Sequence, residues 1–168
     1  MSFIISSDSL LLLILVIQLC VNGFMTGLIW FVQSVHYPLF AQVDSEHHLI
    51  YHQLHVLKTT WVVGPPMLIE LGCTVLLWVN LMNSNQLSLY SNVIFQNLVW
   101  ATSLCLAIVW LSTACLQVPD HTQLSQSFDS AIHHHLVKTN WIRTIGWSLK
   151  LMLCGWMLIL FVKSSQIV

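Results

Sequence analysis

Four apolar stretches, each long enough to cross a membrane, divide this chain. They cover residues 9–35, 59–82, 91–118 and 139–162, and a bilayer core of about 30 Å needs about 20 helical residues. Only 7% of the residues are charged, whereas roughly a quarter are charged in an average soluble domain. We therefore predict one all-α domain over residues 1–168, an integral membrane four-helix bundle.

The two halves of the chain align with each other at an offset of 80 residues. The strings K-T-T-W and K-T-N-W open two matching apolar segments. This alignment indicates a tandem duplication of a two-helix hairpin. Both copies would enter the membrane from the same side, which implies a pseudo-two-fold axis along the membrane normal. The alignment equates Trp30 with Trp110, His55 with His135, Lys58 with Lys138, Thr59 with Thr139 and Trp61 with Trp141.

Glu70 and Lys150 occupy equivalent slots, twelve residues after the two aligned lysines. Twelve helical residues rise about 18 Å, which places both side chains near the bilayer midplane. An isolated charge there costs about 2.5 to 3.5 kcal/mol, so we expect the two to pair. Two roles stay open: an ion pair that only sets the helix register, or a pair that handles protons or binds substrate.

Two long connections and one short turn join the apolar stretches. Proline suits a helix boundary, so Pro38 and Pro119 are predicted to end the first and third helices. His48, His52 and His55 follow helical spacing, and each long connection is predicted to carry a short helix at the membrane surface. The predicted segments are connections at 36–58 and 119–138, surface helices at about 45–57 and 124–136, and a turn at 83–90.

All nine histidines fall in the two long connections, on one side of the membrane. Imidazole is the commonest metal ligand and also an axial ligand of haem. If the two halves are symmetric, His55 and His135 could bind one metal or haem between them. The alternative is that the histidines serve only as polar residues at the membrane interface. The predicted metal ligands are His36, His52, His55, His121 and His135; the predicted cofactor-binding set is His36, His55, His121 and His135; and His47, His48, His133 and His134 are expected to be solvated. A haem or a copper, iron or zinc ion would fit this pattern.

Arg143 lies one turn inside the fourth predicted helix. It could hold an anionic head group, a haem propionate or a substrate carboxylate, or it could snorkel to the interface.

Most basic residues lie on the side of the long connections, so the positive-inside rule places these connections in the cytoplasm. The net charge is -1 and no basic cluster exists, which excludes nucleic acid as a partner. The expected partners are the lipid bilayer and a hydrophobic small molecule.

Four strings carry a resemblance to known families: W-F-V-Q-S-V-H-Y-P at 30–38, G-P-P-M-L-I-E at 64–70, Q-V-P-D-H at 117–121 and K-T-N-W-I-R-T at 138–144. With them, nearly the whole chain resembles uncharacterised bacterial four-helix membrane proteins, which implies a bacterial inner membrane. The helix layout and the N-W-I-R-T string are also similar, more distantly, to anthrone oxygenases. That resemblance implies oxidation of an aromatic polyketide and assigns no catalytic residue to this chain.

Three hypotheses for the function follow. The first is a membrane-embedded metal or haem protein with histidine ligands and an oxidoreductase role, in which Glu70 and Lys150 relay protons or bind substrate and Arg143 holds an anionic group. The second is a small proton-coupled transporter with the Glu70 and Lys150 pair at its centre. The third is an accessory or structural membrane subunit.

Overall fold

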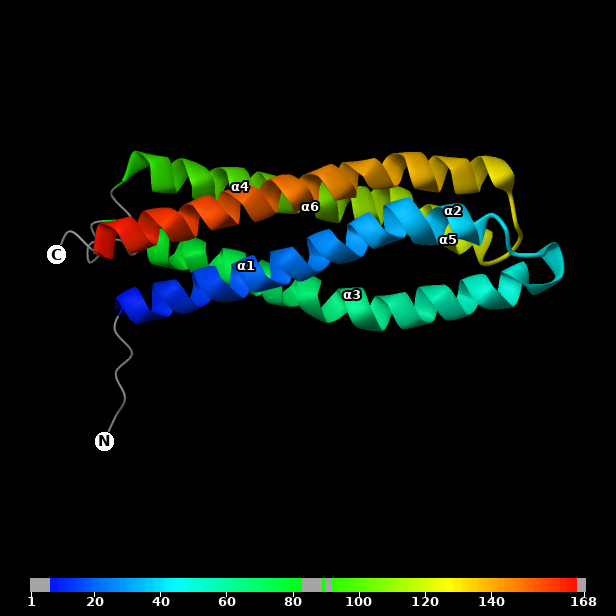
Figure 1. Ribbon diagram of the computed structural model, residues 1–168, viewed down its shortest axis with the longest axis horizontal. Helices are drawn as coiled ribbons and strands as arrows, with labels where there is room; N and C mark the ends of the chain where they lie inside the picture. The colour runs from blue at the N-terminus through cyan, green and yellow to red at the C-terminus, as the bar shows by residue number, and fades with distance from the viewer. Residues whose placement is uncertain (1–6, 83–88, 90–91, 166–168) are drawn as a thin grey trace, which may run out of the picture.

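The computed structural model describes residues 7–82, 89 and 92–165, which form four long helices (Figure 1). Each is long and apolar enough to cross a membrane, so the predicted all-α membrane four-helix bundle is confirmed. The predicted turn at 83–90 lies outside the described residues except for Leu89. The elements are α1 (Ser7–Phe31), the π-helical turn η1 (Val32–His36) and α2 (Tyr37–Phe40) in the first helix; α3 (Ser45–Met82) in the second; α4 (Val93–Ser112), the π-helical turn η3 (Thr113–Gln117) and α5 (Val118–Leu124) in the third; and α6 (Ser130–Ser165) in the fourth.

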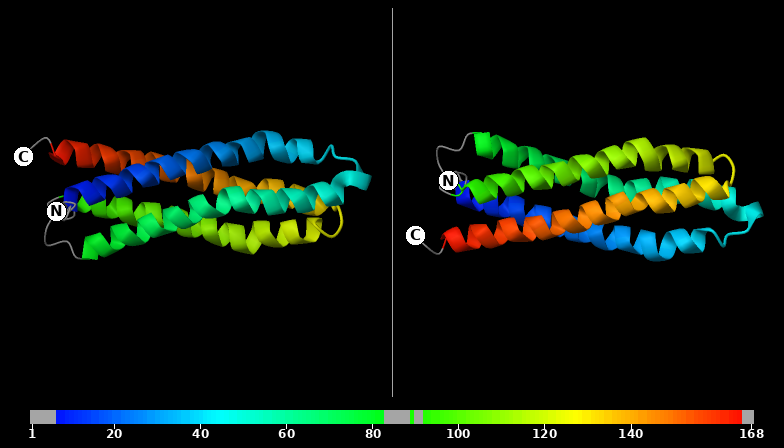
Figure 2. Two further views of the ribbon diagram at one scale, coloured as in Figure 1. Left: turned by 90° about the horizontal axis from the view of Figure 1, so that it is seen from below. Right: turned by 90° about the horizontal axis from the view of Figure 1, so that it is seen from above.

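The helices run alternately up and down the bundle. The loops at 41–44 and 125–129 meet at one end, which we call the loop end, and the first and last described helices begin and finish at the other (Figure 2). α6 packs against both α1 and α4, whereas α3 packs mainly against α1. The bundle is therefore least tightly closed between α3 and the third helix.

The surface helices predicted at 45–57 and 124–136 do not exist as separate elements. α3 includes the whole first segment, and the second is divided among the end of α5, a five-residue loop and the start of α6. These segments have inward-facing side chains, such as His52 and Leu136, that are fully buried in the bundle. Because their inner faces find partners in the bundle, the segments extend the membrane helices instead of lying on the membrane.

The predicted helix ends at Pro38 and Pro119 are also wrong, since each helix continues past its proline. A π-helical turn ends two residues before each proline. In η1 the backbone N–H of Tyr37 donates to the carbonyl of Val32, five residues back, and η3 ends with the equivalent bond. Proline lacks an N–H and clashes with the carbonyl four residues earlier, and the wider π turn accommodates that defect within a continuous helix.

The internal repeat is visible in the fold. The two π-helical turns lie 81 residues apart, and so do the two prolines that follow them. Buried positions of α3 recur in α6 at the predicted offset of 80 residues. The equivalent buried pairs are Met67 and Trp147, Glu70 and Lys150, Thr74 and Cys154, and Leu77 and Met157.

Two side chains cap the helices that follow the connections. The side-chain oxygen of Asn92 accepts hydrogen bonds from the backbone N–H groups of Ile94 and Phe95 at the start of α4. Asp129 does the same for the first amides of α6. Such caps satisfy amides that have no partner within the helix, which is why both helices begin where they do.

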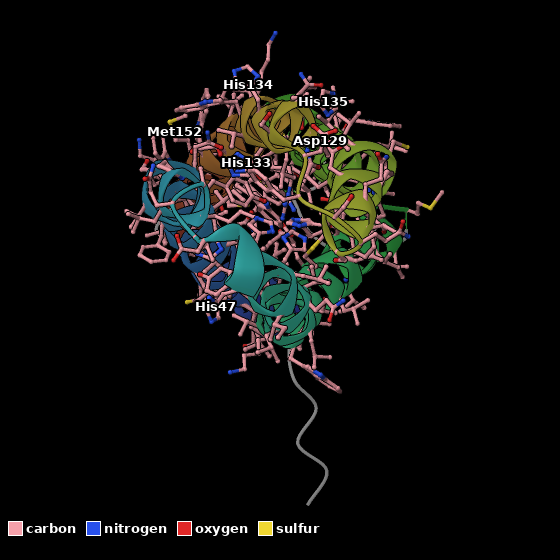
Figure 3. The ribbon with its side chains drawn as sticks, turned by 90° about the vertical axis from the view of Figure 1, so that its right-hand side faces the viewer. His47, Asp129, His133, His134, His135 and Met152 are labelled. Atoms are coloured by element: carbon pink, nitrogen blue, oxygen red, sulfur yellow. The ribbon has the colours of Figure 1, made fainter. Side chains whose placement is uncertain are left out.

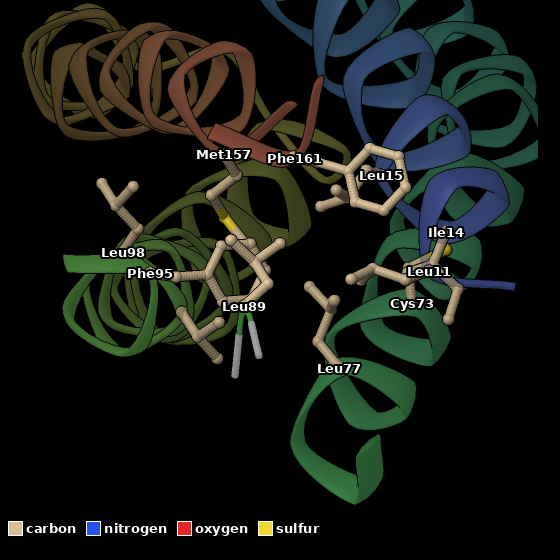
Figure 4. Packing of buried hydrophobic residues seen from close by; sticks show 11 residues of the cluster. Leu11, Ile14, Leu15, Cys73, Leu77, Leu89, Phe95, Leu98, Met157 and Phe161 are labelled. Carbon is tan, nitrogen blue, oxygen red and sulfur yellow. The ribbon is translucent and has the colours of Figure 1, made fainter. Parts of the chain in front are cut away.

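The interior is layered along the bundle axis. The end opposite the loops is filled by an apolar cluster that includes Leu15, Phe95 and Met157 (Figure 4). The middle holds Glu70 and Lys150. Beyond them lies a second apolar cluster, which we call the plug, and the histidines lie beyond the plug at the loop end. The plug consists of Met25, Ile29, Met67, Val109 and Trp147.

Two exposed tryptophans indicate where the membrane boundary lies. Trp61 and Trp141 occupy equivalent positions on α3 and α6 and are 75% and 42% exposed, as expected of side chains in an interfacial aromatic belt. From Trp61 to Met82 the helix rises about 32 Å, close to the thickness of a hydrocarbon core. With this placement the Glu70 and Lys150 pair lies near the midplane, and the loop end projects beyond the core.

Gly146 lets α6 pack closely against α4. A Cβ atom at Gly146 would lie 2.7 Å from Cγ2 of Val109, a fully buried side chain with little freedom to move. We therefore expect Gly146→Ala to destabilise the protein by about 1–3 kcal/mol, measured by unfolding in mild detergent. Adding Val109→Ala should relieve the clash, and a Gly146→Ala protein as stable as the wild type would contradict this account.

Candidate functional site

Four of the predicted histidines gather inside the loop end. His36 comes from η1, His52 and His55 from α3, and His121 from α5. The rings of His36 and His55 stack with their centroids 4.4 Å apart, and the ring of His121 lies 5.2 Å from that of His52 and 5.7 Å from that of His55. In the view onto this end, nitrogen atoms gather at the centre of the bundle (Figure 3).

Tyr37, His121 and His52 form a hydrogen-bonded chain. Nε2 of His121 lies 3.3 Å from the Tyr37 hydroxyl, and Nδ1 of His121 lies 3.3 Å from Nε2 of His52. Nε2 of His52 also lies 3.1 Å from the backbone carbonyl of His121. A carbonyl only accepts, so we assign the proton of His52 to its Nε2, which donates towards His121. The proton of His121 then lies on its Nε2 and is donated to the Tyr37 oxygen.

His135 does not join this cluster, contrary to the prediction that it faces His55. Its Nδ1 lies 2.8 Å from a carboxylate oxygen of Asp120, and its side chain is 52% exposed. The inward position on this part of α6 belongs to His133, which is buried 5.6 Å from the ring of Phe40. The prediction failed because it took symmetry-related residues to face the axis, whereas residue 135 lies on the outer side of its helix.

The four histidines that were predicted to be solvated divide into an exposed pair and a buried pair. His47 and His134 are exposed, as predicted, and lie on the outside of the bundle (Figure 3). His48, however, is buried between Phe40 and Phe128, with ring centroids 4.5 Å and 4.4 Å away. It and His133 pack against phenylalanines at the mouth of the bundle and are not solvated.

The five histidines predicted to share a metal are not arranged around one point. Within the described ranges, no three His, Cys, Asp or Glu side chains form a group that could hold a metal ion. An imidazole binds a metal through a lone pair in the plane of its ring, and the stacked rings of His36 and His55 do not direct such lone pairs at a shared point. Both ring nitrogens of His121 already face Tyr37 and His52.

Arg143 lies beneath the histidines and is 8% exposed. Its Nη1 donates to Oδ1 of Asn140 at 3.3 Å. The amide of Asn140 donates to Gln33, and the amide of Gln33 donates to the carbonyl of Val137. Two buried amides thus hold one corner of the guanidinium, and its Nε has no hydrogen-bond partner among the described residues.

A cleft of about 590 Å³ opens between α3 and the η3–α5 segment, with Arg143 in its wall. Its polar lining includes His55, Gln117 and His121. A smaller cavity of about 40 Å³ lies on the other side of the same residues and adds Tyr37. His55, His121 and Arg143 therefore face both spaces. The apolar lining of the cleft includes Val56, Val63, Met67 and Val118.

Glu70 and Lys150 meet, as predicted, in the middle of the bundle. Nζ of Lys150 donates to Oε1 of Glu70, and both side chains are fully buried. Gln18 and Thr74 extend this polar layer, because the amide of Gln18 donates to the Thr74 hydroxyl at 3.0 Å. The plug separates the pair from the histidines, and neither member lines the cleft.

Tyr37, Gln33 and Asn140 are site residues that were not predicted from the sequence. A signal for two of them was present, because Gln33, Tyr37 and Phe40 share one helix face by their spacing. Their burial near the only arginine of the chain became apparent only when the fourth helix was placed beside the first.

These features define a class: an integral membrane four-helix bundle with a buried charge pair at its middle and a histidine, tyrosine and arginine site beside a cleft at one end. No protein-family model, no curated protein and no solved structure matches the chain.

Proposed function

We propose that this protein is a membrane enzyme that transfers protons to or from a hydrophobic small molecule bound in the cleft, as part of an oxidation. One observation carries the proposal. His121 lines the cleft and is also the central member of the chain that joins His52 to Tyr37. A positioned histidine within hydrogen-bond reach of a bound ligand is the commonest general acid or base.

The chain provides a balanced path for one proton. His121, which lines the cleft, gives the proton on its Nε2 to the ligand, while its Nδ1 takes the proton from Nε2 of His52. Tyr37, which lines the smaller cavity, accepts a hydrogen bond from His121 and holds its ring in place. Nδ1 of His52, which has no partner among the described residues, then takes up a proton from outside. One proton enters at His52 and one leaves at His121, and the reverse sequence removes a proton from the ligand.

The resemblance to anthrone oxygenases supports a lipophilic aromatic ketone as the first substrate to try. Anthrone has an acidic CH₂ group, and loss of a proton there gives an enolate that molecular oxygen can oxidise. Anthrone and O₂ together yield anthraquinone and one water molecule. In this scheme the protein supplies the proton acceptor, and O₂ is the oxidant.

The test compares two histidine variants in lipid nanodiscs supplied with anthrone under air. We expect the wild-type protein to accelerate anthraquinone formation over protein-free nanodiscs, and His121→Phe to lose about 10²-fold or more of that acceleration. His135→Phe, on the outer face of α6, is the matched control and should retain it. The absence of acceleration by the wild type, or an equal loss in both variants, would overturn the proposal.

Metal analysis and an absorption spectrum complete this test. A Soret band, or stoichiometric copper, iron or zinc in the purified protein, would favour the predicted haem or metal oxidoreductase instead. The transporter hypothesis receives less support, because the plug lies between the cleft and the central charge pair.

A further inference from the structure

We propose that Arg143 binds an oxygen anion of the ligand, so that the molecule in the cleft is an amphipathic acid: an apolar body, such as a fused aromatic ring system, that carries an oxyanion such as a carboxylate. The inference rests on the proposed function in one respect, that the cleft is the place where the ligand binds. It adds the chemical class of that ligand and the residue that selects it.

The first support is a buried cation that has no counter-ion among the described residues. Arg143 is 92% buried, and the ion pairs formed by the described residues are Lys150 with Glu70 and His135 with Asp120. A charge removed from water without a partner is costly. Asp120, an acid side chain on α5, is engaged by His135, which leaves the guanidinium charge to be balanced by a bound molecule.

The second support is the way in which the guanidinium is held. Asn140 contacts Nη1, and the Gln33 side chain fixes Asn140 in turn. Both of these partners are neutral amides, so they orient the group without neutralising it. Nε of Arg143 has no partner among the described residues, and the side chain faces the cleft. An oriented arginine of this kind is well suited to a planar oxyanion.

The third support is the character and position of the cleft walls. Val56, Val63, Met67 and Val118 contribute apolar surface to the same cleft. Val63 and Met67 lie on the membrane side of Trp61, and Val56 lies on the other side, so the cleft straddles the boundary that this tryptophan marks. An amphipathic acid dissolved in the bilayer straddles the same boundary, with its apolar body inside the hydrocarbon core and its acid group at the interface.

Binding of a fluorescent pair of probes tests the inference without turnover. Anthracene-9-carboxylate and neutral 9-anthracenemethanol differ only in the group offered to Arg143. We expect the wild-type protein in nanodiscs to bind the carboxylate about tenfold or more tightly than the alcohol. Arg143→Gln should remove that preference and leave the affinity for the alcohol unchanged, and Arg143→Lys should retain part of it.

Lys138→Gln is the matched control, because it removes one positive charge from an exposed position of the same helix. It should keep the wild-type preference. Equal affinity of the wild type for both probes, or an equal loss of both in Arg143→Gln, would overturn the inference. Neither probe has the acidic ring CH₂ group of anthrone, so selective binding without anthrone oxidation would contradict the proposed function alone.

Stability of the ligand-free protein separates an anion site from a structural arginine. Removing a buried charge that has no counter-ion should leave the unfolding temperature of Arg143→Gln equal to or above that of the wild type. A lower unfolding temperature together with an unchanged preference for the carboxylate would identify a structural arginine and overturn the inference.

Discussion

Replacing Glu70 with leucine is expected to lower the free energy of unfolding by about 3–5 kcal/mol. The substitution would leave the ammonium group of Lys150, which donates to Glu70 and is fully buried, without a carboxylate near the middle of the membrane. Lys150→Met should cost a similar amount, because it leaves the carboxylate of Glu70 alone. Unfolding by titration of mild detergent with a denaturing detergent measures both effects.

The double variant Glu70→Leu with Lys150→Met is the control for this prediction. It leaves no unpaired charge, and apolar replacements of a buried ion pair are often neutral, so most of the lost stability should return. Binding of the anthracene probes should also persist, since neither residue lines the cleft. A double variant as unstable as either single variant would contradict the view that pairing is what makes the two charges tolerable.

The second large effect is expected at the plug. Trp147 is fully buried and contacts side chains of the other helices in the apolar layer between the central charges and the cleft. Trp147→Ala removes most of that side chain, and truncation of a buried tryptophan typically costs about 3–5 kcal/mol through lost contacts and the cavity that remains. The same unfolding titration measures the loss.

Trp147→Phe provides the matched control for the plug. It retains an aromatic ring at the same position, and its cost should be clearly smaller than that of the alanine variant. Because Nε1 of Trp147 has no hydrogen-bond partner among the described residues, the phenylalanine variant breaks no such bond of the indole nitrogen. A loss of less than about 1 kcal/mol in Trp147→Ala would show that the layer can collapse around the missing ring.

The helices could be predicted because membrane insertion constrains composition strongly. Length and hydrophobicity alone identify a span of about 20 residues, and four such spans in one chain of 168 residues can hardly form anything but a bundle. The ends of the helices were harder to predict. Pro38 and Pro119 predict helix ends, whereas the π-helical turns that let each helix continue depend on how the widened turn packs against its neighbours.

The candidate site was predicted in part. His36, His52, His55, His121 and Arg143 do lie together, because all of them come from segments that the topology brings to one end. The internal repeat correctly predicts that Glu70 meets Lys150, yet it wrongly predicts that His135 faces His55. Charges at the centre of a bundle must face inward, whereas a histidine near the end of a helix can also be satisfied at the surface, here by Asp120.

By itself, the sequence determined the class of protein, the number of membrane helices, the repeat and the partnership of the two central charges, because bilayer thickness and the cost of burying charge leave few alternatives. The tertiary structure alone decided which histidines face inward and that Tyr37 joins them. It also decided that Arg143 is buried beside a cleft with no ion-pair partner among the described residues. These features depend on helix rotation and on contacts between residues far apart in the chain, and spacing along one helix does not specify either.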